Sequence, residues 1–147
     1  MLPNIYIVNG ANLNLLGVRE PNIYGYQTFE SFFEMLKPKF PDLTLHYFQS
    51  NHEGILLDYL HNIGFEAAGI ILNAGAYTHT SWALHDAIKS ITSPVIEVHI
   101  SNIFSREPFR KHSCLAPACE GSISGLGLQG YELAVSYFQK QISCSIQ

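Results

Sequence analysis

The run Ile5-Tyr6-Ile7-Val8 opens the chain as an apolar strand, and a long connection follows it from Asn9 to Gly25, with the sequence NGANLNLLGVREPNIYG. A continuous apolar run is typical of a strand that is covered on both faces of a parallel sheet. Strand-to-helix connections usually span about 2–6 residues, so a longer one is expected to have a function of its own. The segment predicts a lid at about residues 17–25 that brings Arg19 and Tyr24 over a binding site.

Strand and helix signals alternate along the rest of the chain. Thr28 is the expected N-cap of the first long helix, and Ser50 with Glu53 has the spacing of a capping box for the second. Apolar residues at helical spacing mark the helices, and continuous apolar runs mark the strands. We expect strands at 5–8, 43–49, 68–73, 94–100 and near Ser122. We expect helices at 29–36, from the capping box at Ser50 to the stop at Gly64, at 82–91 and through 131–138.

This alternation implies parallel strands joined by helices that cover both faces of one sheet. About five such units predict a small doubly wound α/β sandwich in a single domain over residues 1–147, because an eightfold barrel needs about 250 residues. Ligands bind such sheets outside the carboxyl ends of the strands. The residues at or just after these ends of the predicted strands are Asn9, Gly10, Asn12, Gln49, Ser50, Asn51, Asn73, Gly75, His79, Glu97, His99 and Ser101.

The composition narrows the functional classes. Hydrophobic residues make up 47% of the chain and charged residues only 14%, which suggests that part of the surface is buried in an oligomer. A net charge of −4 argues against non-specific nucleic-acid binding, because such binding requires a basic surface. The sequence has no signal-peptide pattern and no apolar run of membrane-spanning length, so we expect a cytoplasmic protein.

Common ligand motifs do not occur at the predicted strand ends. No glycine-rich phosphate loop follows a strand, and no Gly-x-Ser-x-Gly serine-hydrolase elbow is present. The cysteines and histidines have no spacing typical of a metal site. We therefore expect no bound metal, and we assign no function to Cys114, Cys119 and Cys144.

The chain has three arginines, and all of them lie in its two long loops: Arg19, Arg106 and Arg110. Arginine forms bidentate pairs with carboxylates and stays charged at any working pH. Arg19 and Arg110 share their loops with other candidate site residues, so we expect both to be functional. Arg106 is expected to be a solvated surface residue, because loop charges are mostly exposed.

Two carboxylates stand out by their positions. Glu97 lies two residues before His99 on the predicted fourth strand, so both side chains can share one face of the sheet, and the carboxylate partner favours a functional histidine. Asp86 lies on the predicted helix 82–91, opposite its apolar stripe. Its carboxylate is expected either in solvent or in an oligomer interface.

Four motifs together resemble type II 3-dehydroquinate dehydratase over nearly the whole chain. They are Asn9–Gly17, Arg19–Gly25, Asn73–Ser81 and Glu97–Asn102, the last followed by the segment Arg106–Arg110. Ala11 and Ala74 stand where proline is expected in this family. The two alanines change backbone stiffness and leave every chemical group in place.

The resemblance implies a flavodoxin-like fold and the dehydration of 3-dehydroquinate to 3-dehydroshikimate, a hydro-lyase reaction of the shikimate pathway without metal or cofactor. It implies that Tyr24 is the general base, kept partly ionised by Arg19, and that His99 is the general acid, oriented by Glu97. Asn12 would stabilise an enolate intermediate. The implied substrate-binding residues are Asn73, His79, Asp86, Ile100, Ser101 and Arg110. In the family, Asp86 would reach a neighbouring subunit's site within a trimer, and trimers commonly assemble into dodecamers.

Two other functions fit the same predicted fold. A non-catalytic doubly wound module would bind a small carboxylate without turnover and would not need Tyr24. A flavin protein of this fold would be yellow, and the missing Ser/Thr-rich phosphate loop argues against it. Turnover of 3-dehydroquinate by the purified protein would identify the dehydratase, binding without turnover would identify the module, and a yellow colour would identify the flavin protein.

Overall fold

The computed structural model describes residues 1–146, apart from the side chain of Tyr24. Its sheet has five parallel strands in the order β2-β1-β3-β4-β5. The strands are β1 (Asn4–Asn9), β2 (Thr44–Gln49), β3 (Gly69–Asn73), β4 (Val95–His99) and β5 (Gly121–Ser124). This order is that of the flavodoxin-like doubly wound fold, so the predicted fold class is confirmed.

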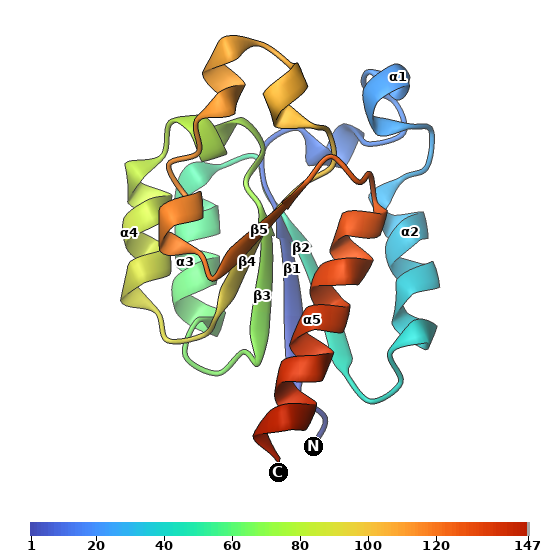
Figure 1. Ribbon diagram of the computed structural model, residues 1–147, viewed down its shortest axis with the longest axis vertical. Coiled ribbons are helices and arrows are strands. Elements are labelled where there is room, and N and C mark those ends of the chain that lie inside the picture. The colour runs from blue at the N-terminus through green and yellow to red at the C-terminus, as the bar shows by residue number, and fades with distance from the viewer. Residues whose placement is uncertain (147) are drawn as a thin grey trace.

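Helices cover both faces of the sheet (Figure 1). On one face lie α2 (Phe29–Leu36) and α5 (Gln129–Ser145), and on the other lie α3 (Glu53–Ile63) and α4 (Trp82–Ser90). Each pair of helices buries its own hydrophobic cluster against the strands, as expected for a sheet that is covered on both sides. No helix within residues 1–146 is both long enough and apolar enough to cross a membrane.

The helix starts agree with the sequence in one case and differ in another. The side chain of Thr28 accepts a hydrogen bond from the Ser31 backbone N–H, so the predicted N-cap is confirmed. The predicted capping box of Ser50 and Glu53 is wrong, because Glu53 is the first residue of α3 and no side chain caps that helix. Ser50 Oγ instead accepts the backbone N–H of His52 at 3.0 Å, in the turn between β2 and the helix.

The long connections contain short helices that the sequence analysis did not predict. The first connection holds a 3₁₀ helix at Leu13–Leu15 and a single turn, α1 (Pro21–Tyr24). The connection before β5 holds three more 3₁₀ segments, at Ile103–Ser105, Pro108–Lys111 and Ala116–Ala118. Segments of three or four residues are too short to leave a periodic hydrophobic signal. Both connections rise above the carboxyl end of the sheet, the end opposite the chain termini (Figure 1).

Candidate active site

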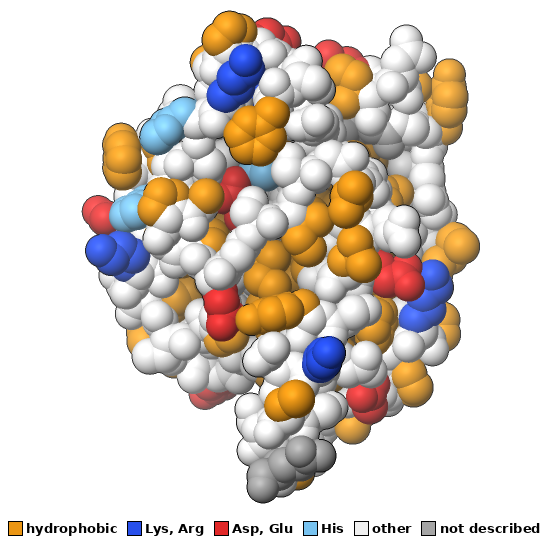
Figure 2. Space-filling model, viewed as in Figure 1, with side chains coloured by type: hydrophobic (Ala, Val, Ile, Leu, Met, Phe, Trp, Pro, Cys, Tyr) orange, Lys and Arg blue, Asp and Glu red, His pale blue; other side chains and the backbone are white. Residues whose placement is uncertain are grey.

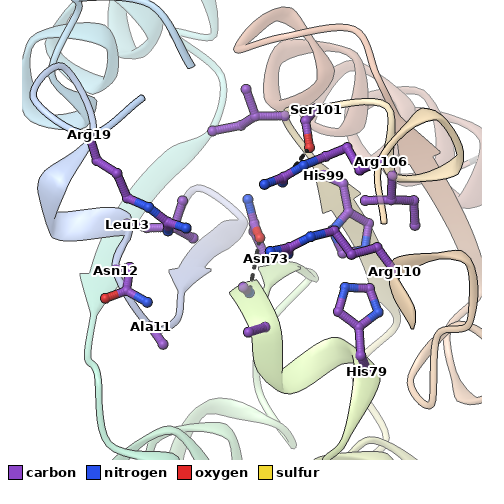
Figure 3. A pocket seen from close by; sticks show the side chains of 14 residues that line it. Ala11, Asn12, Leu13, Arg19, Asn73, His79, His99, Ser101, Arg106 and Arg110 are labelled. Atoms are coloured by element: carbon purple, nitrogen blue, oxygen red, sulfur yellow. Dashed lines mark hydrogen bonds between the residues drawn. The ribbon is translucent and has the colours of Figure 1, made fainter. Parts of the chain in front are cut away.

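A cleft of about 510 Å³, open to solvent, lies at the carboxyl end of the sheet between the two long connections. Most of its lining side chains are polar or cationic, and Figure 3 shows them directed inward. The lining residues are Ala11, Asn12, Leu13, Arg19, Asn73, Gly75, Ala76, His79, His99, Ile100, Ser101, Ile103, Arg106 and Arg110. The structure therefore brings together eight of the eleven site residues that the sequence singled out, from Asn12 to Arg110.

The floor of the cleft is fixed by buried hydrogen bonds between the ends of β1 and β3. The hydroxyl of Tyr131, a fully buried residue of α5, donates to Asn9 Oδ1 at 2.9 Å and accepts from Asn73 Nδ2 at 2.8 Å. A Cβ atom at Gly10 would lie 2.4 Å from the backbone oxygen of Ala74, so only glycine allows the two connections this approach. Asn73 is thus held rigidly where it meets the cleft.

Asn12 occupies a left-handed backbone conformation, with φ of 70°. Its backbone N–H donates to Asn51 Oδ1 at 2.9 Å, and Gln49 Nε2 donates to the same oxygen at 3.0 Å. Asparagine tolerates this conformation better than most residues. The side chains of Gln49 at the end of β2 and Asn51 just after it therefore shape the Asn12 turn and do not line the cleft themselves.

All three arginines of the chain line the cleft, and Arg19 approaches from the side opposite Arg106 and Arg110 (Figure 3). The expectation that Arg106 is a solvated surface residue is wrong. Its side chain is only 12% exposed, and Nη1 donates to Ser101 Oγ at 3.1 Å. Ser101 lies five residues before Arg106 in the same connection, so the local fold of this connection turns the arginine inward.

The acidic side chains that pair with these arginines do not line the cleft. Glu20 Oε2 lies 3.3 Å from Arg19 Nε and 3.9 Å from Arg106 Nη2, and Glu107 pairs with Arg110. The hydrogen bond from Arg110 holds the pKa of the Glu107 carboxyl below its usual value. Among the described residues that line the cleft, none is acidic. A site of this kind attracts an anion.

His99 and Glu97 form a buried pair at the carboxyl end of β4. Glu97 is fully buried behind His99 and hydrogen-bonds to its Nε2 atom. Since an ionised carboxylate can only accept, His99 donates through Nε2, and its Nδ1 remains for a ligand in the cleft. Glu97 itself does not line the cleft, so it can act there only through His99.

His79 lies nearly parallel to His99, with 6.4 Å between the ring centroids. Its Nδ1 atom lies 2.7 Å from the backbone oxygen of His112, so Nδ1 carries the proton and Nε2 is an acceptor in the neutral ring. Burial lowers the pKa of His79, and the nearby His99 and Arg110 act in the same direction. A neutral His79 suits the binding of a ligand hydroxyl.

The lid that the sequence predicts at 17–25 begins and ends at glycines with positive φ, 93° at Gly17 and 79° at Gly25. Glu20 between them also has a positive φ, 42°, which is rare for a residue with a side chain. From residue 17 to 28 no described side chain is buried. The side chain of Tyr24, the predicted base, lies outside the described part of the chain, so its role stays a prediction.

Asp86 lies outside the cleft of its own chain. It is exposed on the outer face of α4, one turn from the exposed Trp82. Leu13, Ile103 and Arg106 line the cleft although the sequence analysis did not assign them to the site. No local signal distinguishes the two apolar residues from core residues, because both are also buried.

The described residues 1–146 contain no group of three or more His, Cys, Asp or Glu side chains placed to hold a metal ion. The three cysteines are free thiols. Burial and the negative charge of Glu97 raise the pKa of the Cys119 thiol to about 12. Cys119 therefore stays protonated and unreactive at neutral pH.

Comparison with known proteins places this geometry in a family. The family model described as dehydroquinase class II matches residues 3–139. The chain is 50% identical over 144 residues to the 3-dehydroquinate dehydratase of Caldicellulosiruptor saccharolyticus, covering 96% of this chain and 99% of that protein. It is 51% identical over 133 residues to 3-dehydroquinate dehydratase 1 of Agrobacterium fabrum, covering 89% and 92% of the two chains.

A solved structure agrees with these relatives. The type II dehydroquinase from Butyrivibrio crossotus superposes with a TM-score of 0.90 at 42% sequence identity. The match covers 94% of this chain and 98% of that one, so the likeness extends over nearly the whole chain.

Proposed function

Because this chain belongs to the class II dehydroquinase family and is a 3-dehydroquinate dehydratase, we propose that it removes water by general base and general acid catalysis through an enolate. The product is 3-dehydroshikimate. The observation that carries the proposal is the cleft itself, in which a buried His99–Glu97 pair faces three guanidinium groups. Its cationic lining suits a substrate with one carboxylate, and its polar floor suits hydroxyl groups.

In the first proposed step, the phenolate of Tyr24 removes a proton from the carbon next to the substrate's ketone. An isolated tyrosine ionises near pH 10, so it needs an adjacent cation to act near neutral pH. Arg19 shares the lid with Tyr24 and reaches into the cleft, which supports this role. The negative charge moves to the ketone oxygen, where Asn12 supplies a donor, directly or through a water molecule.

In the second step, the enolate collapses and expels the β-hydroxyl. The carbon–carbon double bond forms, the carbon–oxygen bond breaks, and the hydroxyl leaves as water with a proton from His99. The buried carboxylate of Glu97 supports this role, because it stabilises the protonated ring and fixes its orientation. The two steps use groups from different segments, the lid and the end of β4.

Substrate positioning is proposed to use the fixed parts of the cleft. Asn73, His79 and the backbone at Ile100 and Ser101 would hold the substrate's hydroxyls and carboxylate. Arg110 would supply positive charge to the same carboxylate. The same location supports a contribution from Arg106, which the sequence analysis did not assign.

The enzyme is proposed to need no metal ion, cofactor or imine. Activity should survive a chelator, and borohydride added with the substrate should leave the enzyme active, because no imine forms that borohydride could trap. Loss of activity under either treatment would contradict this part of the proposal. The proposed location is the cytoplasm, where reduced thiols like those of this chain persist.

Assembly into trimers, and of trimers into a dodecamer, is also proposed. Asp86 and Trp82 share an exposed face of α4, from which the carboxylate would reach the cleft of a neighbouring copy. Figure 2 shows further hydrophobic side chains gathered near the centre of one face, and the edge strand β5 lies there with the half-exposed Tyr137. Light scattering should give a multiple of three, and Asp86→Ala should weaken substrate binding or assembly. A fully active monomer would contradict this proposal.

The decisive experiment is an ultraviolet assay of the purified protein with 3-dehydroquinate. The product contains a conjugated enone that absorbs where the substrate does not, so turnover appears as a rise in absorbance. Tyr24→Phe is the matched control, because it removes one hydroxyl and keeps the ring. Binding without turnover would instead indicate a non-catalytic carboxylate-binding module.

A further inference from the structure

Ser113 lies behind the His99–Glu97 pair, in the connection between the 3₁₀ segments Pro108–Lys111 and Ala116–Ala118. Its Oγ atom is 3.0 Å from Glu97 Oε1 and 2.9 Å from Glu97 Oε2. Glu97 is fully buried, and a buried carboxylate is costly unless hydrogen bonds compensate its lost hydration. Ser113 supplies that compensation on the side of the carboxylate away from the cleft.

The direction of this hydrogen bond follows from the other contacts of Ser113. Its Oγ atom accepts the backbone N–H of Leu115 at 3.1 Å and that of Ala116 at 2.9 Å. A hydroxyl has two lone pairs and one proton, so these two donors occupy both lone pairs. The remaining proton faces Glu97, and Ser113 can only donate to the carboxylate.

The segment around Ser113 is fixed on both sides by backbone hydrogen bonds. The Cys114 N–H donates to the backbone oxygen of Thr78 at 2.7 Å, and the Cys114 oxygen lies 2.7 Å from His85 Nδ1. Before Ser113, the His112 oxygen binds the His79 ring. Cys114 and Leu115 are also buried, so the hydroxyl is held in one place.

We propose that Ser113 is a positioning residue for the general acid. Its hydroxyl keeps Glu97 a pure hydrogen-bond acceptor and holds the carboxylate against Nε2 of His99. This arrangement leaves Nδ1 of His99 as the atom that gives its proton to the departing hydroxyl. The inference rests on the proposed function, because it needs His99 to act as the acid.

The test compares Ser113→Ala with Ser113→Thr, which keeps the hydroxyl, and with Ser81→Ala. Ser81 is a buried serine that caps α4 through the Leu84 N–H and does not line the cleft, so it controls for the cost of losing a buried serine hydroxyl. Ser113→Ala should lower kcat roughly 10- to 100-fold, as expected for a charge-assisted hydrogen bond, with KM within about threefold. Ser113→Thr should recover most of the rate, and Ser81→Ala should keep wild-type kcat.

A second measurement separates positioning from general destabilisation. In heavy water, the enolate has two fates: it takes a deuteron back and returns to substrate, or it loses its hydroxyl and becomes product. The ratio of deuterium in recovered substrate to product formed therefore reports how well the acid step competes with return. His99→Ala should raise this ratio if the proposed mechanism is right, and Ser113→Ala should raise it as well. A raised ratio in His99→Ala with a wild-type ratio in Ser113→Ala would overturn the inference and leave the mechanism standing.

A third measurement does not depend on the reaction. The Nε2 proton of His99, bonded to a buried carboxylate, should give a protected downfield proton NMR signal that is absent in His99→Ala. In Ser113→Ala we expect this signal to broaden or disappear at neutral pH, and in Ser113→Thr to persist. An unchanged signal in Ser113→Ala would overturn the inference, even if the proposed mechanism had already failed its own test.

Discussion

The floor and the lid of the cleft are built in opposite ways. The floor joins β1, β3 and α5 through the buried hydrogen bonds of Tyr131 and the backbone contact of Gly10 with Ala74. The lid at 17–25 and residues 26–28 after it have no buried described side chain, and Val18 in the lid and Tyr26 just after it are 76% and 80% exposed. Segments with few buried contacts open at low free-energy cost.

The difference separates the two proposed catalytic groups. The acid, His99, belongs to the rigid sheet and has its orientation fixed by Glu97. The proposed base, Tyr24, belongs to a segment bounded by glycines with left-handed backbones. An enzyme built this way can admit its substrate by moving the base while the acid stays in place. Substitutions in the lid should therefore lower the catalytic rate, and substitutions in the floor should lower the free energy of unfolding.

The largest effect is expected for Tyr24→Phe in the lid. Loss of a general base typically lowers the rate by about 10²–10⁴-fold, and none of the described residues that line the cleft is a tyrosine or a carboxylate that could replace it. Substrate or product binding should stay within a few-fold, and the melting temperature should stay unchanged, because the substitution removes only a hydroxyl. Steady-state kinetics, equilibrium binding and thermal unfolding check these three expectations. Turnover at the wild-type rate would refute Tyr24 as the base.

The next effect is expected for Arg19, also in the lid. A neighbouring cation shifts an acid's ionisation by about 1–3 pH units, so Arg19→Ala should lower kcat near neutral pH roughly 10–10³-fold. The loss should shrink as the pH rises, because the tyrosine then ionises without help. Arg19→Lys keeps the charge but loses the planar donor pair, so we expect partial activity. The dependence of kcat on pH in both variants measures how the loss changes with pH. An Arg19→Ala profile parallel to the wild-type profile would contradict the role of Arg19 in ionising the tyrosine.

A smaller effect on rate, with a clear effect on stability, is expected for Tyr131→Phe in the floor. The substitution leaves Asn9 Oδ1 and Asn73 Nδ2 without their buried partner, at a cost of about 1–3 kcal/mol in the free energy of unfolding. Tyr26→Phe is the matched control, because Tyr26 is 80% exposed and such changes stay within about ±0.5 kcal/mol. Denaturant unfolding of both variants makes the comparison. Equal stabilities would show that the floor is not the rigid element.

The smallest effect is a pH dependence of stability through His79. Its pKa in the folded protein lies below the unfolded value near 6.5, so the unfolded chain takes up the proton first. The stability that the neutral ring contributes is complete above about pH 6.5 and falls as the pH drops toward the folded-state pKa. The stability of the wild type relative to His79→Gln should therefore decline between pH 7 and pH 5. The exposed His61→Gln serves as the control, and a flat difference for His79→Gln would contradict the expectation.

The sequence predicted the features that depend on periodic patterns, namely the strands and the long helices. Continuous apolar runs and helical spacing gave five parallel strands with helices on both faces, and Thr28 marked a helix start correctly. Motif resemblance then brought most of the site residues to one edge of the sheet. The capping box at Ser50 failed because two residues of turn precede α3, and spacing alone does not reveal where a strand stops.

What the sequence missed depends on contacts between distant segments. Arg106 resembles any loop arginine in the sequence, and only the fold brings Glu20 of the first long connection to within 3.9 Å of it. Ser113 gains its role only because the connection before β5 passes behind Glu97, and no motif links the two positions. Side chains whose function comes from a neighbour in space carry no local signal, and only the folded structure reveals them.

The position of Tyr131 also bears on how the protein is made. A chain synthesised from its N-terminus exposes Asn9 and Asn73 long before α5 leaves the ribosome, and α5 carries the hydroxyl that joins them. Until that helix docks, only backbone hydrogen bonds join the ends of the first and third strands, and the side chains of Asn9 and Asn73 lack the hydroxyl that connects them. A nascent chain that stops before residue 129 should therefore hold the lid, the arginines and the His99–Glu97 pair and still lack a finished binding surface, so that catalysis begins with the last helix.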